Sequence, residues 1–543
     1  MLKQMQQRLV RARGQAVVLF ALVWLFFLAR ALHVFGPDSA YVQYFNSDSA
    51  LPVLMANDRV IDPFRVYIYG QDQFGAWPFL CAQLLHRAAG FVWTDRSIFI
   101  YQTIWLFLSV WAVVCLCRKQ RIFGAQLFLF VLCLHFAANR YLFVINQRYA
   151  WQVTVLLFAW LCLRRVCESA FAPDKFSRRD IGRHLALYLF SLLAVWMSPT
   201  STLMLASVFA LEALRARVLE RERSASSASR RVLLRLGGGI GALALAVVTE
   251  ALLRANFYRF ALKHYGRDYR TPMALDWGHI AENLQRQLHN FAQSAWWPLT
   301  VFAVLASVVA LAQLRRAARR NARMQSIDVY ADPFVLDTVV LALGSCAFAL
   351  INLAITVIFL WFRLNAFGQR YLALTYLFGS FSGLLFLSLA LCLWLPWRAQ
   401  RRLVPTALTA ALLVVLLIRF PAKLIDPTYT PLKQVAATLA QRAPGACVLG
   451  GYWDTYVLAG LQTQGTIIPV PAEDQYVRTP WTPQLMRAAR EVLVVQHDYQ
   501  NFGGREHPAQ TIRQHGCVLT LVEPRWYEDD GYTFSLYRNE TAR

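Results

Sequence analysis

Long apolar segments, separated by short polar ones, recur along the chain from residue 16 to about residue 420. Apolar runs of about 18 residues or more are typical of helices that cross a membrane. The pattern predicts about eleven such helices, several of them short. Their expected bounds are about 16–36, 98–117, 123–138, 150–163, 185–198, 201–214, 236–256, 293–314, 335–360, 371–396 and 404–420. The fold class expected from this pattern is a polytopic α-helical membrane protein.

The basic residues of the polar segments predict how these helices are oriented. Lys and Arg follow every second predicted helix, as in "RKQR" at 118–121 and "WRAQRR" at 397–402. The Ser-rich segment 215–235 is also basic and resembles a flexible linker. Cytoplasmic loops of membrane proteins are enriched in Lys and Arg, which is known as the positive-inside rule. By this rule we expect the N-terminus to lie in the cytoplasm, and the loop 37–97 and the tail after residue 421 to lie outside.

The composition removes one interpretation of the net charge. The chain carries a formal charge of +24 at pH 7, which by itself would suggest a nucleic-acid partner. However, 57% of the residues are apolar, and the basic residues gather in the loops that are predicted to be cytoplasmic, where membrane proteins are enriched in Lys and Arg. We therefore expect membrane lipid, and no nucleic acid, as a partner.

The tail, residues 422–543, has a different character from the rest of the chain. Its apolar runs shorten to strand length, as in "CVLGG", "TIIPV", "VLVVQ", "CVLTLV" and "TFSLY". Helical patterns such as "PLKQVAATLAQRA" and "TPQLMRAAREV" lie between them. Alternating strands and helices predict a small α/β domain outside the cytoplasm. Cys447 and Cys517 begin two of these strands. We favour two buried free thiols over a disulfide between them, although both alternatives remain open.

The first outer loop, 37–97, contains an acidic cluster that includes Asp48 and Asp72. Within it, "SALPVLMANDRV" has apolar residues at spacings compatible with a short interfacial helix. Asp48 would stand at the start of this helix, where a carboxylate is stabilised by the helix N-terminus. Capping is therefore a structural role for Asp48 that competes with a catalytic one.

The segment "FNSDSALPVLMANDRVIDPFRVYIYGQDQFGAW" resembles the first outer loop of the GT-C glycosyltransferases. These are polytopic enzymes similar to bacterial protein O-mannosyltransferases and lipid A aminoarabinose transferases. The residues that match the family pattern are Asp48, Met55, Ala56, Tyr69, Gly70, Gln71, Phe74 and Gly75. "WMSPTSTLML" resembles the family's Trp-x-x-Pro hairpin, and "GQRYLAL" at 368–374 resembles the Arg-Tyr that opens a late span. The layout implies a GT-C-like domain over 1–421 followed by the outer domain 422–543.

The resemblance implies a glycosyltransferase of the bacterial inner membrane. Its donor would be a sugar on a polyprenyl phosphate, and its acceptor a hydroxyl of a glycan, lipid or protein at the outer face. An acceptor hydroxyl is a poor nucleophile and needs a base, for which Asp48 is the candidate. A single base without a covalent intermediate implies inversion at the anomeric carbon. Asp72 is the second catalytic candidate, as a support for Asp48 or as a ligand of a cation.

Cationic and polar residues at the outer face are the candidates for substrate binding. The leaving phosphate needs cationic donors, although snorkelling to lipid headgroups is an alternative role for each of them. The candidates are Tyr69, Gln71, Arg148, Lys263, His264, Arg370 and Tyr371. Arg370 has the strongest case because it occupies the family's Arg-Tyr position. The next outer segment, "NRYLFVINQRY" at 139–149, contains no acid, so a divalent cation is compatible with the sequence but no metal site is predicted.

Two other functions remain open. One is a transporter or flippase for a lipid-linked glycan, although transporters often show internal repeats and mid-membrane charges that we do not find here. The other is a noncatalytic protein that binds a polyprenyl-linked sugar, which Ser49 allows because many relatives have an acid after the aspartate. The long acidic loop and the outer domain favour chemistry at the membrane surface.

Overall fold

The computed structural model of the chain describes most of the 543 residues. The described residues are 47–69, 71–117, 148–170, 177–221, 229–270, 274–293, 333–365, 369–394, 429–461, 467–474, 477–497, 502–504, 506–529 and 531–542, with short pieces between 124 and 132 and between 301 and 316.

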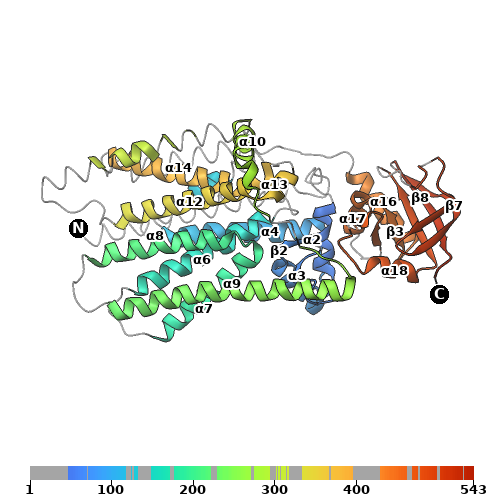
Figure 1. The fold of residues 1–543 in the computed structure, drawn as a ribbon, viewed down its shortest axis with the longest axis horizontal. Coiled ribbons are helices and arrows are strands. Elements are labelled where there is room, and N and C mark those ends of the chain that lie inside the picture. The colour runs from blue at the N-terminus through green and yellow to red at the C-terminus, as the bar shows by residue number, and fades with distance from the viewer. Residues whose placement is uncertain are drawn as a thin grey trace, which may run out of the picture.

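Among the described residues, seven long helices form a bundle in which they run roughly side by side (Figure 1). They are α4 (Asp95–Leu116), α6 (Tyr149–Ala170), α7 (Arg178–Met197), α8 (Ser201–Arg221), α9 (Ser229–Tyr265), α12 (Pro333–Ile358) and α14 (Ala373–Trp394). Neighbours pack closely in the pairs α4–α6, α6–α7, α7–α9 and α12–α14. Shorter helices lie at its edges: α10 (Ile280–Gln293), α13 (Leu360–Leu364), and the 3₁₀ turns η2 (Trp277–His279) and η4 (Gln369–Leu372).

Four stretches of the described chain are long and apolar enough to cross a membrane by length and composition. They are Asp95–Leu116, Val232–Tyr265, Val335–Ile358 and Arg370–Ala390. They correspond to the spans predicted at 98–117, 236–256, 335–360 and 371–396. The spans predicted at 16–36 and 404–420 lie outside the described residues, as does most of the span at 123–138 and half of the span at 293–314.

Several helices extend beyond their predicted bounds. The hairpin was expected at 185–198 and 201–214, whereas α7 already begins at Arg178 and α8 continues to Arg221, with the break still at Ser198–Thr200. The predicted linker 215–235 is shorter, because α8 continues to Arg221 and α9 already begins at Ser229. Likewise, the expected loop 257–292 contains the end of α9 and nearly all of α10. Polar residues continue these helices past the apolar runs because good helix formers such as Arg and Glu need no apolar surroundings.

A buried network of charges joins α6, α8 and α12. The Arg164 guanidinium is 2.7 Å from a carboxylate oxygen of Glu212, and the exposed fractions of these two residues are 1% and 0%. Arg215 donates through Nε to Asp337 at 2.6 Å and through a terminal nitrogen to Glu168 at 3.0 Å. Each buried arginine therefore has acidic partners, which charges need inside a protein of low polarity.

The first loop folds into a compact unit at one end of the bundle. It consists of α2 (Ser47–Asn57), β1 (Tyr67–Ile68), β2 (Gln71–Gly75) and α3 (Trp77–Ala89), with β1 and β2 antiparallel. Gly75 lies so close to Trp196 at the end of α7 that a side chain there would overlap the indole. The indole nitrogen of Trp196 donates to the carbonyl of Val66 at 3.0 Å. The hairpin α7–α8 thus holds the loop in place.

The sequence predicted that α2 is an interfacial helix with its apolar face toward lipid. In the structure, this face is buried inside the protein instead. Its apolar residues Ala50, Leu51 and Met55 are each fully buried. They belong to a core shared with the C-terminal domain, because α2 packs directly against α17 of that domain. The apolar spacing in the sequence was therefore that of a core helix.

The C-terminal domain contains a six-stranded mixed sheet. Its elements are α16 (Tyr429–Arg442), β3 (Cys447–Gly450), α17 (Tyr452–Leu461), β4 (Ile468–Pro471), α18 (Thr482–Ala488), β5 (Glu491–Gln496), β6 (Thr511–Gln514), β7 (Cys517–Asp529) and β8 (Tyr532–Asn539). The strand order is β4-β3-β5-β8-β7-β6, with β3 parallel to β4 and β5 and the other pairs antiparallel. The predicted strands and two predicted helices are present, and Cys447 and Cys517 are buried free thiols.

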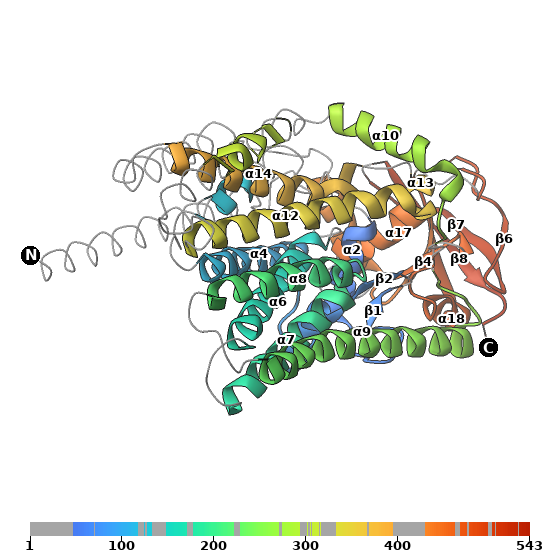
Figure 2. The ribbon, with the colours of Figure 1, turned by 60° about the vertical axis from the view of Figure 1, so that its left-hand side comes forward.

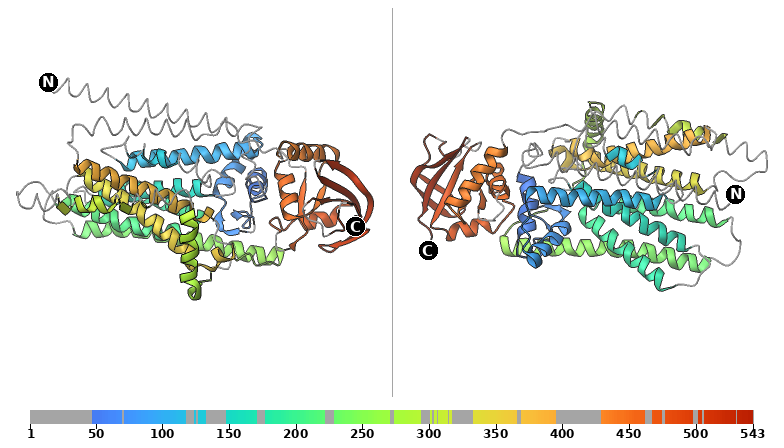
Figure 3. Two further views of the ribbon diagram at one scale, coloured as in Figure 1. Left: turned by 90° about the horizontal axis from the view of Figure 1, so that it is seen from above. Right: turned by 180° about the vertical axis from the view of Figure 1, so that it is seen from behind.

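The first-loop unit lies between the helix bundle and the C-terminal domain (Figures 1 and 3). Helix α9 runs past this unit as far as the domain (Figure 2). Just beyond its end, Arg267 forms an ion pair with Asp474 of the domain at 3.5 Å. Residues that the chain separates by several hundred positions therefore meet at this end of the bundle.

We predict that this end faces away from the cytoplasm. Alkaline phosphatase, which is active only outside the cytoplasm, should be active when fused after Arg543. The same reporter inserted between residues 221 and 229 should be inactive, because the positive-inside rule places that basic segment in the cytoplasm. Phosphatase activity with the opposite pattern would contradict the predicted orientation.

We also predict that the buried network dominates the stability of the bundle. Arg164→Ala would leave Glu212 buried without its main partner, which should lower the free energy of unfolding by roughly 3–5 kcal/mol. The exposed pair Arg286–Glu282 is the matched control, because Arg286→Ala should cost less than about 1 kcal/mol. Thermal unfolding of the purified variants in detergent measures both, and equal losses would argue against this role.

Candidate functional site

Asp48 stands in the first turn of α2, where the sequence placed it. The helix N-terminus stabilises a negative charge at this position. Pro52 has no N–H to donate to the carbonyl of Asp48, so the first turn is held less by its own backbone than in an ordinary helix. The Asp48 carboxylate is half-buried, and its Oδ1 accepts a 2.7 Å hydrogen bond from the hydroxyl of Tyr452. Tyr452 begins α17 of the C-terminal domain.

Arg148 lies directly before α6, and only 4% of its surface is exposed. One terminal nitrogen donates to the side-chain oxygen of Gln71 at 3.3 Å, and the guanidinium lies 4.6 Å from the ring centre of Phe74. Its buried Nε has no hydrogen-bond partner among the described residues. Burial lowers the pKa of Arg148, and the charge of Asp48 opposes this shift. A buried guanidinium with spare donors is suited to receive an anion.

Arg370 and Tyr371 approach Asp48 from the turn η4. A terminal nitrogen of Arg370 donates to the hydroxyl of Tyr371 at 3.0 Å, and the guanidinium lies 4.9 Å from the ring centre of that tyrosine. The negative charge of Asp48 acts on both side chains. Asn352 of α12 donates to the backbone carbonyl of Tyr371 at 2.9 Å, so the turn is anchored to the bundle.

Arg478 reaches the same region from the C-terminal domain. Its guanidinium lies 6.0 Å from the ring centre of Tyr452, and its positive charge acts on Arg148. The backbone N–H groups of Arg478 and Thr479 both donate to the buried hydroxyl of Tyr456, at 2.8 and 2.9 Å. Tyr456 lies on α17, so the segment that carries Arg478 is fixed to the helix that carries Tyr452.

These residues form one group, which we call the Asp48 cluster. Its members are Asp48, Arg148, Arg370, Tyr371, Tyr452 and Arg478. It combines one carboxylate with three guanidinium groups, so the described residues give it an excess of positive charge. Such a group can bind an anion, while the carboxylate beside it can accept a proton.

Asp72 lies elsewhere in the first-loop unit. Side chains alternate between the two faces of a strand, and Gln71 and Asp72 are neighbours in β2. Gln71 meets Arg148 of the Asp48 cluster, whereas Asp72 is buried and accepts a hydrogen bond from the hydroxyl of Tyr258 on α9. Gln71 therefore contacts the Asp48 cluster, whereas Asp72 is hydrogen-bonded to a helix of the bundle.

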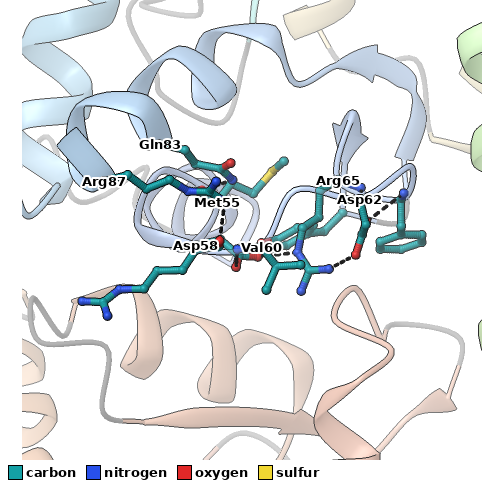
Figure 4. Close-up of polar contacts among 10 residues, drawn as sticks. Met55, Asp58, Val60, Asp62, Arg65, Gln83 and Arg87 are labelled. Carbon is teal, nitrogen blue, oxygen red and sulfur yellow. Dashed lines mark hydrogen bonds and ion pairs between the residues drawn. The ribbon is translucent and has the colours of Figure 1, made fainter.

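Tyr69 contacts a second polar group in the first loop, whose members Asp58, Asp62 and Arg65 are seen in Figure 4. Its buried hydroxyl donates to Asp58, which also pairs with Arg65 at 2.6 Å. Arg65 pairs with Asp62 as well, and its guanidinium lies 4.0 Å from the ring centre of Trp481 in the C-terminal domain. Burial raises the pKa of Tyr69 well above its ordinary value, so the hydroxyl keeps its proton. These contacts shape the loop and hold it against the domain.

Lys263 and His264 are exposed in the last turn of α9. The ring of His264 stacks on Phe260 of the same helix, with ring centres 4.2 Å apart. Among the described residues, neither side chain contacts the Asp48 cluster. The structure thus brings together Asp48, Gln71, Arg148, Arg370 and Tyr371 but leaves Lys263 and His264 at the surface.

The described part of the chain contains no group of three His, Cys, Asp or Glu side chains that could hold a metal ion. The positive charges that it provides beside Asp48 are arginines.

The sequence analysis missed Tyr452 and Arg478. Tyr452 lies 404 positions from Asp48 in the chain, so no local pattern connects them. One signal was available, because both residues follow parallel strands, Tyr452 after β3 and Arg478 after β4. In α/β sheets, binding residues gather beyond the carboxyl ends of such strands.

Comparison with known proteins identifies the fold. The chain matches no family model, and no curated protein is similar to it. Among solved structures it resembles ArnT from Cupriavidus metallidurans bound to undecaprenyl phosphate, with a TM-score of 0.54 at 12% identity over 98% of this chain and 99% of that one. The same ArnT in the apo state gives a TM-score of 0.40 at 11% identity, covering 97% and 98% of the two chains.

The oligosaccharyltransferase AglB from Archaeoglobus fulgidus, in complex with an inhibitory peptide and a dolichol-phosphate, gives a TM-score of 0.41. Its identity is 11%, over 89% of this chain and 69% of that one. Of these three structures, only the ArnT with bound undecaprenyl phosphate, at a TM-score of 0.54, is similar enough to this chain to show its fold. The chain therefore shares its fold with this ArnT structure, as the resemblance of its motifs to the GT-C family implied, and four of its described helices are long and apolar enough to cross a membrane.

Proposed function

We propose that the protein is a glycosyltransferase that moves a sugar from a polyprenyl phosphate to an acceptor hydroxyl at the membrane surface. The observation that carries the proposal is the Asp48 cluster, in which a carboxylate lies among guanidinium groups at the end of a membrane bundle. The reaction needs both kinds of group, because a proton must leave the acceptor while a phosphate leaves the donor. The GT-C fold supports the same reaction class.

Asp48 is the proposed general base. It takes the proton of the acceptor hydroxyl while the oxygen attacks the anomeric carbon of the donor sugar. A bond forms between that oxygen and the anomeric carbon, and the bond from this carbon to the phosphate oxygen breaks. The products are the glycosylated acceptor and the polyprenyl phosphate, and Asp48 returns its proton to solvent. Because the attack is direct, the anomeric configuration inverts.

Arg148 and Arg370 are the proposed partners of the phosphate. As the bond to the sugar breaks, negative charge develops on the phosphate, and cationic donors that are already in place stabilise it. Arg148 suits this role because it is buried and its Nε has no partner among the described residues. Arg370 is anchored through Tyr371 and Asn352, so its guanidinium has little freedom to lose on binding.

The lipid carrier accounts for the position of the site. A polyprenyl chain stays in the bilayer while its phosphate lies at the surface, so the phosphate site must lie where bundle and surface domain meet. The Asp48 cluster draws Arg148 and Arg370 from the bundle side and Tyr452 and Arg478 from the C-terminal domain. The ArnT structure with undecaprenyl phosphate bound suggests this lipid as a probe.

We predict that Asp48→Asn abolishes transfer without preventing folding. Asn caps a helix nearly as well as Asp but cannot accept the proton, so turnover should fall by roughly 10²-fold or more. The assay uses purified protein in lipid nanodiscs with undecaprenyl-phosphate-linked hexoses, pentoses and aminopentoses labelled in the sugar. A cell-envelope extract supplies the acceptor, and label transferred from the lipid is measured.

Asp72→Asn is the matched control, since it makes the same change in the same loop outside the cluster. If Asp48→Asn transfers sugar normally, Asp48 is not the base. If wild-type protein transfers no sugar from any donor but moves the lipids across the bilayer of sealed vesicles, the protein is a transporter. If it binds undecaprenyl phosphate and does neither, it is a noncatalytic binder.

We also predict that Arg370→Ala and Arg148→Lys weaken the binding of undecaprenyl phosphate. Hydrogen bonds to charged groups contribute about 1.5–3 kcal/mol, so each variant should lose roughly ten- to a hundredfold in affinity. Lysine keeps the charge of Arg148 but cannot reproduce a planar fork of donors. Lys263→Ala, which removes an exposed cation outside the cluster, should bind normally. Equilibrium binding to nanodiscs measures all three, and normal affinity in both arginine variants would refute the phosphate site.

A further inference from the structure

The C-terminal domain is packed onto the proposed base more tightly than a domain on a flexible tether would be. Helix α17 lies against α2, and Gly460 of α17 approaches Ala50 of α2 so closely that a Cβ on Gly460 would overlap that residue, 2.8 Å from its Cα. Ala50 lies only two positions after Asp48. The contact between the domains therefore includes the turn that carries the base.

Tyr452 is held rigidly within this contact. Only 5% of its surface is exposed, and its ring packs on those of Trp453 and Tyr456, with ring centres 5.0 and 5.3 Å away. Burial raises the pKa of Tyr452 well above its ordinary value, and the charge of Asp48 raises it further. The hydroxyl therefore keeps its proton and can only be the donor in its 2.7 Å hydrogen bond to Asp48.

We propose that the C-terminal domain completes the active site, with Tyr452 as the residue that positions the Asp48 base. The inference rests on the proposed function of Asp48. By holding Oδ1, the Tyr452 hydroxyl fixes the carboxylate and directs Oδ2 toward the acceptor hydroxyl. The same domain contributes the third guanidinium, that of Arg478, so the cluster is incomplete unless α17 is docked on α2.

The hydrogen bond has a chemical consequence beyond orientation. A hydrogen bond donated to a carboxylate stabilises its charged form, which is the form that can act as a base. Removing the hydroxyl should therefore lower turnover even though the ring of Tyr452 still packs between the domains. A residue that merely glued the two domains together would not have this effect.

Tyr452→Phe tests the proposal because it removes the hydroxyl and keeps the ring packing. We expect kcat to fall roughly tenfold or more, while the affinity for undecaprenyl phosphate stays within about twofold. In an Asp48→Asn background, Tyr452→Phe should have little further effect, because the two residues act as one unit. The transfer assay in nanodiscs described above provides these measurements.

Gly460→Ala tests the docking without touching either side chain of the hydrogen bond. The added methyl group would push α17 away from α2, so kcat should fall at least as far as in Tyr452→Phe. Gly241→Ala is the matched control, because Gly241 lies in a helix with open space around its Cβ position and should be neutral or slightly stabilising. Both proteins are checked for normal expression and thermal unfolding.

The outcomes separate this inference from the proposed function. If Asp48→Asn is inactive but Tyr452→Phe keeps its kcat, the positioning role is overturned and the base assignment stands. An equal loss from Tyr452→Phe in the wild-type and Asp48→Asn backgrounds also overturns the positioning role. If Asp48→Asn transfers sugar normally, the base assignment fails and this inference fails with it.

Discussion

Charges that lie out of contact with water must be compensated, and this constraint organises both ends of the helix bundle. At one end, Arg164 and Arg215 meet Glu168, Glu212 and Asp337, so each buried cation has acidic partners. In the Asp48 cluster at the other end, the charge of the Asp48 carboxylate acts on the guanidinium groups of Arg148 and Arg370, and the guanidinium of Arg478 lies beside Tyr452. A structure that pairs its charges so closely in one place and leaves an excess in another is suited to take up an anion at the second place.

The first-loop unit connects the bundle to this cluster through two groups of polar contacts with different roles. Asp58, Asp62 and Arg65 satisfy one another, and Arg65 also packs on Trp481 of the C-terminal domain. These ion pairs neutralise the charges of Asp58, Asp62 and Arg65 and fix the shape of the loop. Asp48 takes no part in these ion pairs, and it accepts a hydrogen bond from the neutral hydroxyl of Tyr452. Its negative charge acts on Arg148 and Arg370.

The cluster is assembled from four parts of the chain, and contacts outside the cluster hold three of them. The hairpin α7–α8 holds the loop through Trp196, Asn352 holds the turn of Arg370, and Tyr456 holds the segment of Arg478. None of these anchors belongs to the cluster itself. A substrate that must be aligned between a membrane and a surface domain requires such a rigid frame, because a shift of about 1 Å in a reacting group can cost about 10²-fold in rate.

The amino-acid sequence by itself determined the helical bundle, the small α/β domain and the position of Asp48 at the start of a helix. These features depend on local patterns, namely long apolar runs, strand-length apolar runs and the residues that begin a helix. The tertiary structure alone decided which polar residues meet. Gln71 and Asp72 are neighbours in the sequence, yet the alternation of β2 sends one to Arg148 and the other to Tyr258. Tyr452 and Asp48 lie 404 positions apart and meet only because α17 packs on α2. Contacts between distant segments depend on how whole surfaces fit together, and no short stretch of sequence contains that information.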